Sequence, residues 1–363
     1  MITFMKVAER CCRILAFMLL IATLTLSLTM SPVLADSDKR VVNVMTQNMD
    51  AGTDLLYFFA ISDPVLATQL TYDELLANDF SGRAGLLADQ IVIQQPSLIA
   101  LQEVTLWQTI SATGETRILA DQLDLLMDAL AARHQEYEII ASQDLTDISA
   151  PLGDGSYLRF LDRNVILART DLAQSELALS NVRSGIYQAK IAPVPGFPEE
   201  LNGWISVDAK IRGKSLRFFC THLESPVSQV DDTQVRQGQE LIAIMSHSEL
   251  PVILAGDFNS DASGLKIGPD QTPTAAMIVE AGYADAWQTL QPGELGLTWP
   301  LYLEDIYAGP SSPFERIDLI FARNLEILDV EVVGTVPPFP SDHAGLVATL
   351  RIENSQHDRH DHR

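Results

Sequence analysis

The segment Pro251-Val252-Ile253-Leu254-Ala255-Gly256-Asp257-Phe258-Asn259 joins a short apolar run to a glycine, a carboxylate and an amide. An apolar run that stops at a glycine is typical of a buried strand ending in a turn. In extended backbone, side chains two positions apart lie on the same face. The segment therefore predicts a strand whose end presents Asp257 and Asn259 to one ligand.

Other apolar runs end on the same kinds of residue, which are those that bind divalent metals and phosphates. These endings are Asn48, Glu103, His222 and the region of Asp318, Asp342 and His343. A single such ending can be a surface acid, a turn residue or a core histidine. Their repetition in one chain predicts an active site where strand ends converge.

Asp318 lies inside the apolar run 317–321, where an unpaired carboxylate would be costly. It therefore needs a partner, and His343 is the one we expect. Asp342 and His343 are adjacent, so in extended backbone their side chains point apart. One of them can then bind a metal while the other contacts a phosphate.

Strand and helix patterns alternate along the chain and predict an α/β protein with short, partly antiparallel strands. Strands are expected at 41–45, 98–101, 137–140, 165–168, 252–255, 317–321, 327–333 and 346–352, with a hairpin formed by 205–211 and 216–220. Helices are expected at 73–95 (with Gly82 and Gly85 as potential breaks), 119–133, 234–245 and 274–281, and a loop at 144–157. No GxGxxG or Walker motif follows a strand, which argues against dinucleotide and nucleoside-triphosphate folds.

Residues 1–35 have the pattern of a secretory signal peptide. A basic start precedes the apolar stretch 14–30, and Val33 and Ala35 form a small-residue cleavage pattern. The alternative is an uncleaved anchor, because the apolar stretch approaches the ~20 residues that span a bilayer. Cleavage leaves a chain with no second membrane span, which we expect to be a monomer that is secreted or periplasmic. The predicted catalytic domain is 36–352, and the polar, His-containing tail 353–363 is predicted to be disordered.

The chain has a formal net charge of −24, and loss of residues 1–35, which carry +2, leaves −26. An acidic surface disfavours duplex DNA as a partner, although charge can be locally segregated. It also indicates that a metal must attract any phosphate. After cleavage Cys220 is the single remaining cysteine. It lies in an apolar run, so we expect a buried and inert thiol.

Six motifs resemble those of the endonuclease/exonuclease/phosphatase superfamily, which includes pancreatic-type deoxyribonucleases, abasic-site endonucleases, neutral sphingomyelinases and inositol polyphosphate 5-phosphatases. They occur in that superfamily's order and span residues 41–350. The motifs are Thr46-Gln47-Asn48, Leu101-Gln102-Glu103-Val104, Thr221-His222-Leu223-Glu224, Gly256-Asp257-Phe258-Asn259-Ser260, Arg316-Ile317-Asp318-Leu319-Ile320 and Ser341-Asp342-His343.

The resemblance implies a four-layer sandwich of two mixed β-sheets flanked by helices, and hydrolysis of a phosphoester with Mg²⁺, or alternatively Mn²⁺. By the family pattern, Glu103 is the central metal ligand, with Asn48 and Asp342 nearby. Asp257 orients or deprotonates the attacking water, and Asn259 holds a phosphate oxygen. His343, oriented by Asp318, contacts the phosphate, and so does His222, which can also assist the leaving group.

Elementary chemistry agrees with these implied roles. Mg²⁺ prefers oxygen ligands and retains several waters, so one or two carboxylates suffice. A histidine paired with an aspartate is held in one tautomer and is favoured as the cation, which suits an anionic transition state. The partner of His222 is left open. Asn164 is a potential brace for the site, and Trp299 is either a substrate contact or a packing residue.

These observations support an exported phosphoesterase acting on a phosphodiester or a phosphomonoester. The phosphorylated substrate can be a small molecule, a lipid headgroup or a nucleic acid, and an extracellular endonuclease is the alternative. A catalytically inactive binding module of the same fold is a second alternative, but it predicts vacant motif positions, and all of them are filled.

Overall fold

The computed structural model describes residues 40–53, 55–191, 200–226, 232–302 and 312–352. The predicted signal peptide, 1–35, and the predicted tail, 353–363, lie outside these residues, so both stay predictions. None of the helices within the described ranges is long and apolar enough to cross a membrane. The described residues fall in a single compact unit that begins at Arg40.

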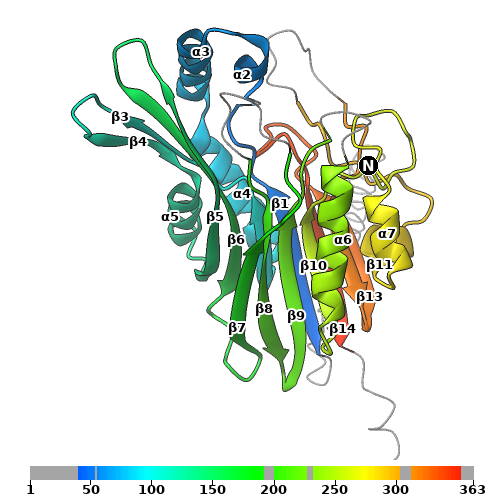
Figure 1. Cartoon of the computed structure of the whole chain (residues 1–363). Helices are drawn as coiled ribbons and strands as arrows, with labels where there is room; N and C mark the ends of the chain where they lie inside the picture. Colours follow the sequence, from blue (N-terminus) through cyan, green and yellow to red (C-terminus); the bar gives the residue numbers. More distant parts are fainter. Residues whose placement is uncertain (1–39, 54, 192–199, 227–231, 303–311, 353–363) are drawn as a thin grey trace, which may run out of the picture. The chain divides into compact units, whose positions relative to one another are not determined.

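Two mixed β-sheets form the centre of this unit (Figure 1). Sheet A has the order β13 (Leu325–Val333), β14 (Gly345–Ile352), β1 (Val41–Asn48), β2 (Leu98–Gln102), β6 (Tyr157–Arg169), β3 (Leu106–Ile110) and β4 (Thr116–Asp121), with β5 (Tyr137–Pro151) on the other edge of β6. Sheet B has the order β11 (Ala284–Asp285), β12 (Asp318–Arg323), β10 (Val252–Asp257), β9 (Lys214–His222), β8 (Gly203–Ile211) and β7 (Leu177–Ile186).

Apolar side chains from the two sheets face each other and form the central core. Val44, Ala100, Phe218, Ile253 and Ile320 are among its buried members. Because both faces of β10 are covered, all six of its residues are buried. The pattern that predicted a buried strand at 252–255 is therefore confirmed.

Helices cover the outer face of each sheet and complete the predicted four-layer sandwich (Figure 1). On sheet A, α4 (Phe80–Gln94) and α5 (Gln122–Ala132) bury Leu87, Ile91 and Leu126 in one cluster. On sheet B, α6 (Thr233–Ser246) and α7 (Thr274–Glu280) bury Leu241 and Ile278 in another. The helix α3 (Pro64–Ala77) and the short helices α2 (Leu56–Ala60) and α8 (Ala286–Leu290) complete the described set.

The predicted hairpin at 205–220 is present as β8 and β9, joined by Arg212 and Gly213. Both residues have positive φ, 45° and 91°, as a two-residue type I′ turn requires. This turn matches the right-handed twist of the strands, and it aligns Gly203 with His222 at the other end of the pair.

Two predicted elements are wrong. The helix expected at 73–95 is split into α3 and α4 at Asn78 and Asp79, because the Asp79 side chain accepts from the N–H of Gly82 and starts a new helix. The loop expected at 144–157 is mostly strand, since β5 continues to Pro151. Pairing with the long strand β6 overrides the turn-forming composition of that segment.

The strand registers bring the motif residues to one end of the two sheets. In sheet B, Asp257 pairs with His222 on one side and with Asp318 on the other. In sheet A, the parallel strands β1 and β2 end together at Asn48 and Gln102. Gly256 permits this convergence, because a Cβ there would lie 2.1 Å from the carbonyl oxygen of Thr221.

Candidate active site

All the predicted site residues lie at the converging strand ends, which are the upper ends in Figure 1. Sheet A contributes four of them, at or just beyond strand ends or in the loop before β14. These are Asn48, Glu103, Asp342 and His343. Sheet B contributes the other four, which are His222, Asp257, Asn259 and Asp318.

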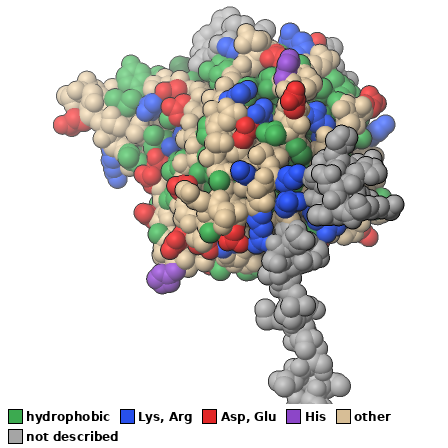
Figure 2. Space-filling model, turned by 90° about the horizontal axis from the view of Figure 1, so that it is seen from below, with side chains coloured by type: hydrophobic (Ala, Val, Ile, Leu, Met, Phe, Trp, Pro, Cys, Tyr) green, Lys and Arg blue, Asp and Glu red, His purple; other side chains and the backbone are tan. Residues whose placement is uncertain are grey.

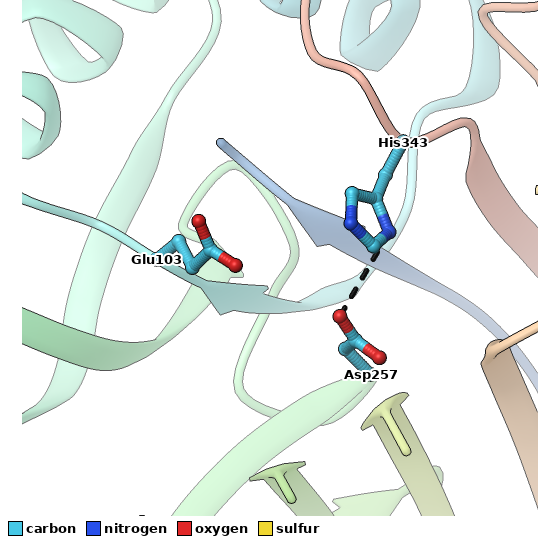
Figure 3. Close-up of side chains that lie close together, drawn as sticks. All are labelled: Glu103, Asp257 and His343. Carbon is cyan, nitrogen blue, oxygen red and sulfur yellow. Dashed lines mark ion pairs between the residues drawn. The ribbon is translucent and has the colours of Figure 1, made fainter. Parts of the chain in front are cut away.

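Glu103 follows β2, and its side chain lies on the side that faces Asp257 and His343 (Figure 3). Its Oε1 accepts from Asn48 Nδ2 at 2.7 Å, and its Oε2 accepts from the backbone N–H of Ala51 at 2.7 Å. The side chain remains 25% exposed. A donor atom of Glu103, one of Asp257 and one of His343 all lie within 4.8 Å of one another, a spacing that could hold a metal ion.

Asn48 joins the two halves of the site. Its Nδ2 donates to Glu103 Oε1 and also to Asp257 Oδ2, at 2.9 Å. Its Oδ1 accepts from the backbone N–H of Asp50 at 2.9 Å. In this arrangement Asn48 braces two carboxylates with its amide nitrogen, and its predicted ligation of a metal stays a prediction.

Asp257 lies between the two histidines and is 1% exposed. Its Oδ1 accepts from the backbone N–H of Asn259 at 2.9 Å, while its Oδ2 lies 3.8 Å from His222 Nε2 and 3.8 Å from His343 Nδ1. Burial raises the pKa of Asp257, the carboxylate of Asp318 adds to the rise, and the two histidines oppose it. A raised pKa suits a carboxylate that accepts a proton.

The predicted pairing of His343 with Asp318 is present. Asp318 Oδ2 lies 2.9 Å from His343 Nδ1, and both residues are buried. The hydroxyl of Thr298 accepts from the N–H groups of Ile317 and Asp318 and so holds the start of β12. Burial alone would lower the pKa of His343, but the carboxylates of Asp318 and Asp342 raise it well above its ordinary value.

Asp342 does not point away from His343 as predicted, because residues 341–343 form a bend rather than extended backbone. Asp342 Oδ1 lies 3.9 Å from His343 Nε2, and the indole N–H of Trp299 donates to Asp342 Oδ2 at 3.0 Å. Partial burial raises the pKa of Asp342 to about 7, although His343 opposes the rise. Trp299 therefore contacts a predicted metal-binding carboxylate directly.

His222 faces the site with Nε2, which lies 3.3 Å from Asn259 Nδ2 and 4.0 Å from Glu103 Oε1. Its Nδ1 is buried and makes no hydrogen bond within the described residues. Burial alone would lower the pKa of His222, but the carboxylates of Asp257, Glu103 and Asp162 raise it.

Asp162 was missed by sequence reasoning. It lies on β6, is buried, and interacts electrostatically with His222, and burial raises its pKa to about 7. The available signal was an acid directly after two apolar residues, in Phe160-Leu161-Asp162, but the same pattern occurs in strands with one solvated face. Asn164, two residues on, donates to the carbonyl oxygen of Gly203 and ties β6 to β8.

A polar cluster beside Asp342 was also missed. The hydroxyl of Tyr302 donates to Asp50 Oδ2 at 2.6 Å, and Arg83 forms an ion pair with the same oxygen at 3.2 Å. The charge of Asp50 helps to raise the pKa of Asp342. Asp50 stands two residues after Asn48, so its position just beyond the motif was the available clue.

The donor set fits a hard divalent cation. Glu103 and Asp342 offer carboxylate oxygens, which is the ligand chemistry that Mg²⁺ and Mn²⁺ accept. Both side chains are partly exposed.

The basic residues of sheet B lie away from the site. Arg217 and Arg323 are at the opposite end of the sheet from His222 and Asp318. Figure 2 shows Lys and Arg side chains gathered on that lower face. Positive charge near the site therefore comes from the histidines, from Arg83 beside Asp50 and from any bound cation.

Comparisons with known proteins agree with this geometry. A model of the Endonuclease/Exonuclease/phosphatase family matches residues 46–343. A search of curated proteins gave no match. Among solved structures, an endonuclease/exonuclease/phosphatase from Beutenbergia cavernae is similar with a TM-score of 0.53 and 22% identity, covering 87% of this chain and 72% of that one.

Two further structures share the fold. A mannosyl-6-phosphatase from Bacteroides thetaiotaomicron has a TM-score of 0.51 and 15% identity, covering 85% of this chain and 99% of that one. The human nocturnin catalytic domain with bound sulfate has a TM-score of 0.51 and 16% identity, covering 86% and 94%. With the family model spanning all six motifs, the chain belongs to the Endonuclease/Exonuclease/phosphatase family, whose members are hydrolases that act on phosphoesters.

Proposed function

We propose that the protein is an exported, Mg²⁺-dependent phosphoesterase that hydrolyses a phosphodiester or a phosphomonoester by in-line attack of water. The observation that carries the proposal is the bridge at the centre of the site. One amide, that of Asn48, holds Glu103 and Asp257 together from two different sheets. A carboxylate suited to a metal and a carboxylate suited to a water thus lie side by side.

Glu103 and Asp342 are the residues that would hold the cation, with Mn²⁺ as an alternative to Mg²⁺. The bound cation would neutralise charge on the phosphate. Asn48 keeps the Glu103 carboxylate in place, and Trp299 does the same for Asp342.

Asp257 would align the attacking water and accept its proton, since its pKa is raised above the usual range. Its Oδ1 is already bonded to the N–H of Asn259, which leaves Oδ2 as the oxygen that faces the site. Asn259 would contact a phosphate oxygen through its amide, which lies beside His222 Nε2.

The two histidines would bind the phosphate as cations. Nearby carboxylates raise the pKa of both histidines, which favours the cationic form. His343 is locked by Asp318, so its role is to stabilise negative charge. His222 has no comparable lock within the described residues, and it would donate the proton from Nε2 to the leaving oxygen.

The proposed substrate class rests more on the net charge of the chain than on the proteins of similar fold. The proteins of similar fold include one described as a mannosyl-6-phosphatase. The chain's net charge of −24 disfavours a long polyanion. We therefore propose a small phosphorylated molecule or a lipid headgroup, with nucleic acid as the alternative. Export rests on the signal-peptide pattern of residues 1–35.

The test is hydrolysis of bis(p-nitrophenyl) phosphate and p-nitrophenyl phosphate by the protein lacking residues 1–35, with Mg²⁺ and with a chelator. Asp257→Ala is the matched inactive variant. Metal-dependent cleavage of either ester that disappears in the variant supports the proposal. Cleavage of the diester alone indicates a phosphodiesterase, which then requires a direct test on single- and double-stranded DNA.

Two outcomes would contradict the proposal. Hydrolysis that survives in Asp257→Ala would show that the assigned chemistry is wrong. If neither ester is cleaved and calorimetry shows no Mg²⁺ binding, the protein is a binding module that has kept the fold and not the reaction.

A further inference from the structure

Three residues in the loops of the site have backbone in the left-handed region although none is glycine. They are Asp50, with φ of 60°, Glu103, with φ of 51°, and Asn259, with φ of 45°. Asp and Asn tolerate this region, but Glu does so less readily. Such a conformation persists only when the surrounding structure imposes it, so each loop must be held by specific contacts.

Gln122 holds both loops on the sheet A side. It is the first residue of α5 and is 4% exposed. Its Nε2 lies 2.8 Å from the carbonyl oxygen of Asp50, 3.3 Å from that of Glu103 and 2.7 Å from Thr105 Oγ1. Its backbone N–H also donates to the carbonyl oxygen of Thr105. One side chain therefore links the two segments that present Asn48 and Glu103.

Gln234 makes the corresponding contacts on the sheet B side. It belongs to α6 and is 2% exposed. Its Nε2 donates to the carbonyl oxygens of Phe258 and Asn259, at 2.7 and 2.6 Å. Its Oε1 accepts from the Thr274 hydroxyl at 2.5 Å, which fixes the orientation of the amide. The segment that presents Asp257 and Asn259 is thus held from outside the sheet.

We propose that Gln122 and Gln234 are positioning residues, each of which sets the geometry of one half of the site. Gln122 sets the metal-binding half, and Gln234 sets the half that holds the water and the phosphate. This inference rests on the proposed function, which assigns the roles of the two halves. Neither glutamine contacts a reacting group. Each acts through the backbone carbonyl oxygen of a residue with positive φ.

The division follows from the layers of the fold. The α5 helix lies outside sheet A and α6 lies outside sheet B, so each glutamine reaches only the strand ends of its own sheet. A buried amide nitrogen is suited to the role, because it can donate to two carbonyl oxygens at once. Removing the amide of Gln234 takes away the donor to the Phe258 and Asn259 carbonyl oxygens. Removing that of Gln122 leaves the Asp50 carbonyl oxygen to Arg83 and the Glu103 carbonyl oxygen to the N–H of Thr105, and breaks the link between the two loops. In both cases the loop is expected to relax.

The experiment compares Gln122→Met and Gln234→Met, which keep chain length and lose the amide. Calorimetric titration with Mg²⁺ alone measures metal affinity, and hydrolysis of a p-nitrophenyl ester at saturating Mg²⁺ measures kcat. We expect Gln122→Met to weaken Mg²⁺ binding about tenfold and to recover its kcat when Mg²⁺ is raised. We expect Gln234→Met to bind Mg²⁺ like the wild type and to lose about tenfold in kcat, which added Mg²⁺ does not restore.

Gln237→Met is the matched control. Gln237 lies on the same helix, is 1% exposed, and donates to the carbonyl oxygen of Ala189. It makes no hydrogen bond to residues 257–259 or to the Asp50 and Glu103 loops within the described structure. We expect its thermal stability to fall as in the other two variants while its Mg²⁺ affinity stays unchanged.

Hydrogen exchange of the metal-free protein separates this inference from the proposed function. Gln122→Met should speed exchange in peptides covering 49–53 and 103–106, and Gln234→Met should do so in 257–262. If the two variants show the expected exchange but the wild-type protein hydrolyses neither ester, the proposed function is contradicted and the positioning roles are not. Variants that change Mg²⁺ affinity and kcat together, in proportion to their loss of stability, would overturn the inference.

Discussion

The two halves of the site differ in how open they are. On the sheet A side, the Glu103 and Asp342 side chains are 25% and 23% exposed. On the sheet B side, those of Asp257 and Asp318 are 1% and 0% exposed. An ion arrives from solution and needs accessible ligands, whereas a group that aligns a water or a histidine works best when it is buried and fixed. Exposure therefore separates the two predicted carboxylate ligands, but not the buried Asn48, from the predicted acid–base groups.

Two hydrogen bonds connect the halves across the sandwich. Asn48 on β1 donates to Asp257 on β10, and His343, just before β14, is paired with Asp318 on β12. The halves are thus built on separate sheets, and these polar contacts couple them beyond the shared apolar core. Variants on either side should then have separable effects on metal binding and turnover.

The largest expected effect comes from the pair Glu103→Gln and Asp257→Asn. Glu103→Gln removes a ligand charge and should weaken Mg²⁺ binding more than about tenfold. Asp257→Asn should keep Mg²⁺ affinity near the wild-type value and lower kcat about 10³-fold, because it removes the proton acceptor. Calorimetry and turnover at saturating Mg²⁺ measure the two effects.

The same two variants also test whether the two halves of the site are separate. A donor atom of Asp257 lies within 4.8 Å of one on Glu103, close enough for both to bind one ion. If Asp257→Asn weakens Mg²⁺ binding as much as Glu103→Gln does, Asp257 is itself a ligand and the two halves share the metal.

A smaller effect is expected for Asp318→Asn, about 10² in kcat. Loss of the Asp318 carboxylate removes the nearest charge that keeps the pKa of His343 high. The pKa of His343 should fall, so less of it is cationic at neutral pH. An NMR titration of the imidazole measures this shift, and an unchanged His343 pKa would show that the pairing does not control its protonation.

A pH-dependent effect is expected on the sheet A side. Asp342 has a pKa raised to about 7, so a proton competes with a cation for its carboxylate below that pH. Mg²⁺ affinity should therefore weaken by about tenfold as the pH falls from 8 to 6. Asp342→Asn should bind Mg²⁺ more weakly and with less dependence on pH. Equal pH dependence in the two proteins would assign the proton to another group.

The smallest expected effect is on the thermal stability of the protein, and it comes from Asp270, a buried residue near the sheet B half of the site. The N–H of Asp270 donates to Glu315 Oε1 at 2.9 Å, and burial, with the charge of Glu315 adding to it, raises the pKa of Asp270 to about 8. The Asp270 carboxyl therefore keeps its proton in the folded state at pH values where the unfolded state has lost it. As a result, the free energy of unfolding declines as the pH rises from about 4 to about 8. Asp270→Asn should raise Tm by about 2 °C or more at pH 8, and by less at pH 5. A constant difference in Tm across this range would mean that Asp270 does not titrate there.

Much of the fold was predictable because its signals are local. The apolar run of β10, the Arg212-Gly213 turn and the helical spacing of α6 each depend on neighbouring residues. The length of β5 was not predictable in this way, because residues 144–151 have a loop-like composition and become strand through pairing with β6. The break between α3 and α4 arises from a side-chain cap at Asp79 rather than from the nearby glycines.

By itself, the sequence determined which residue types end the strands, and hence the chemistry that they can perform. Carboxylates, amides and histidines placed after apolar runs identify a phosphoester site, and the buried position of Asp318 already required a partner. Only the tertiary structure decided how these groups meet. It showed that Asn48 bridges two sheets, that the charge of Asp162 on β6 acts on His222, and that Gln122 and Gln234 hold the loops. The physical reason is that strand order, register and helix packing join residues far apart in the chain, and no local pattern of residues encodes those contacts.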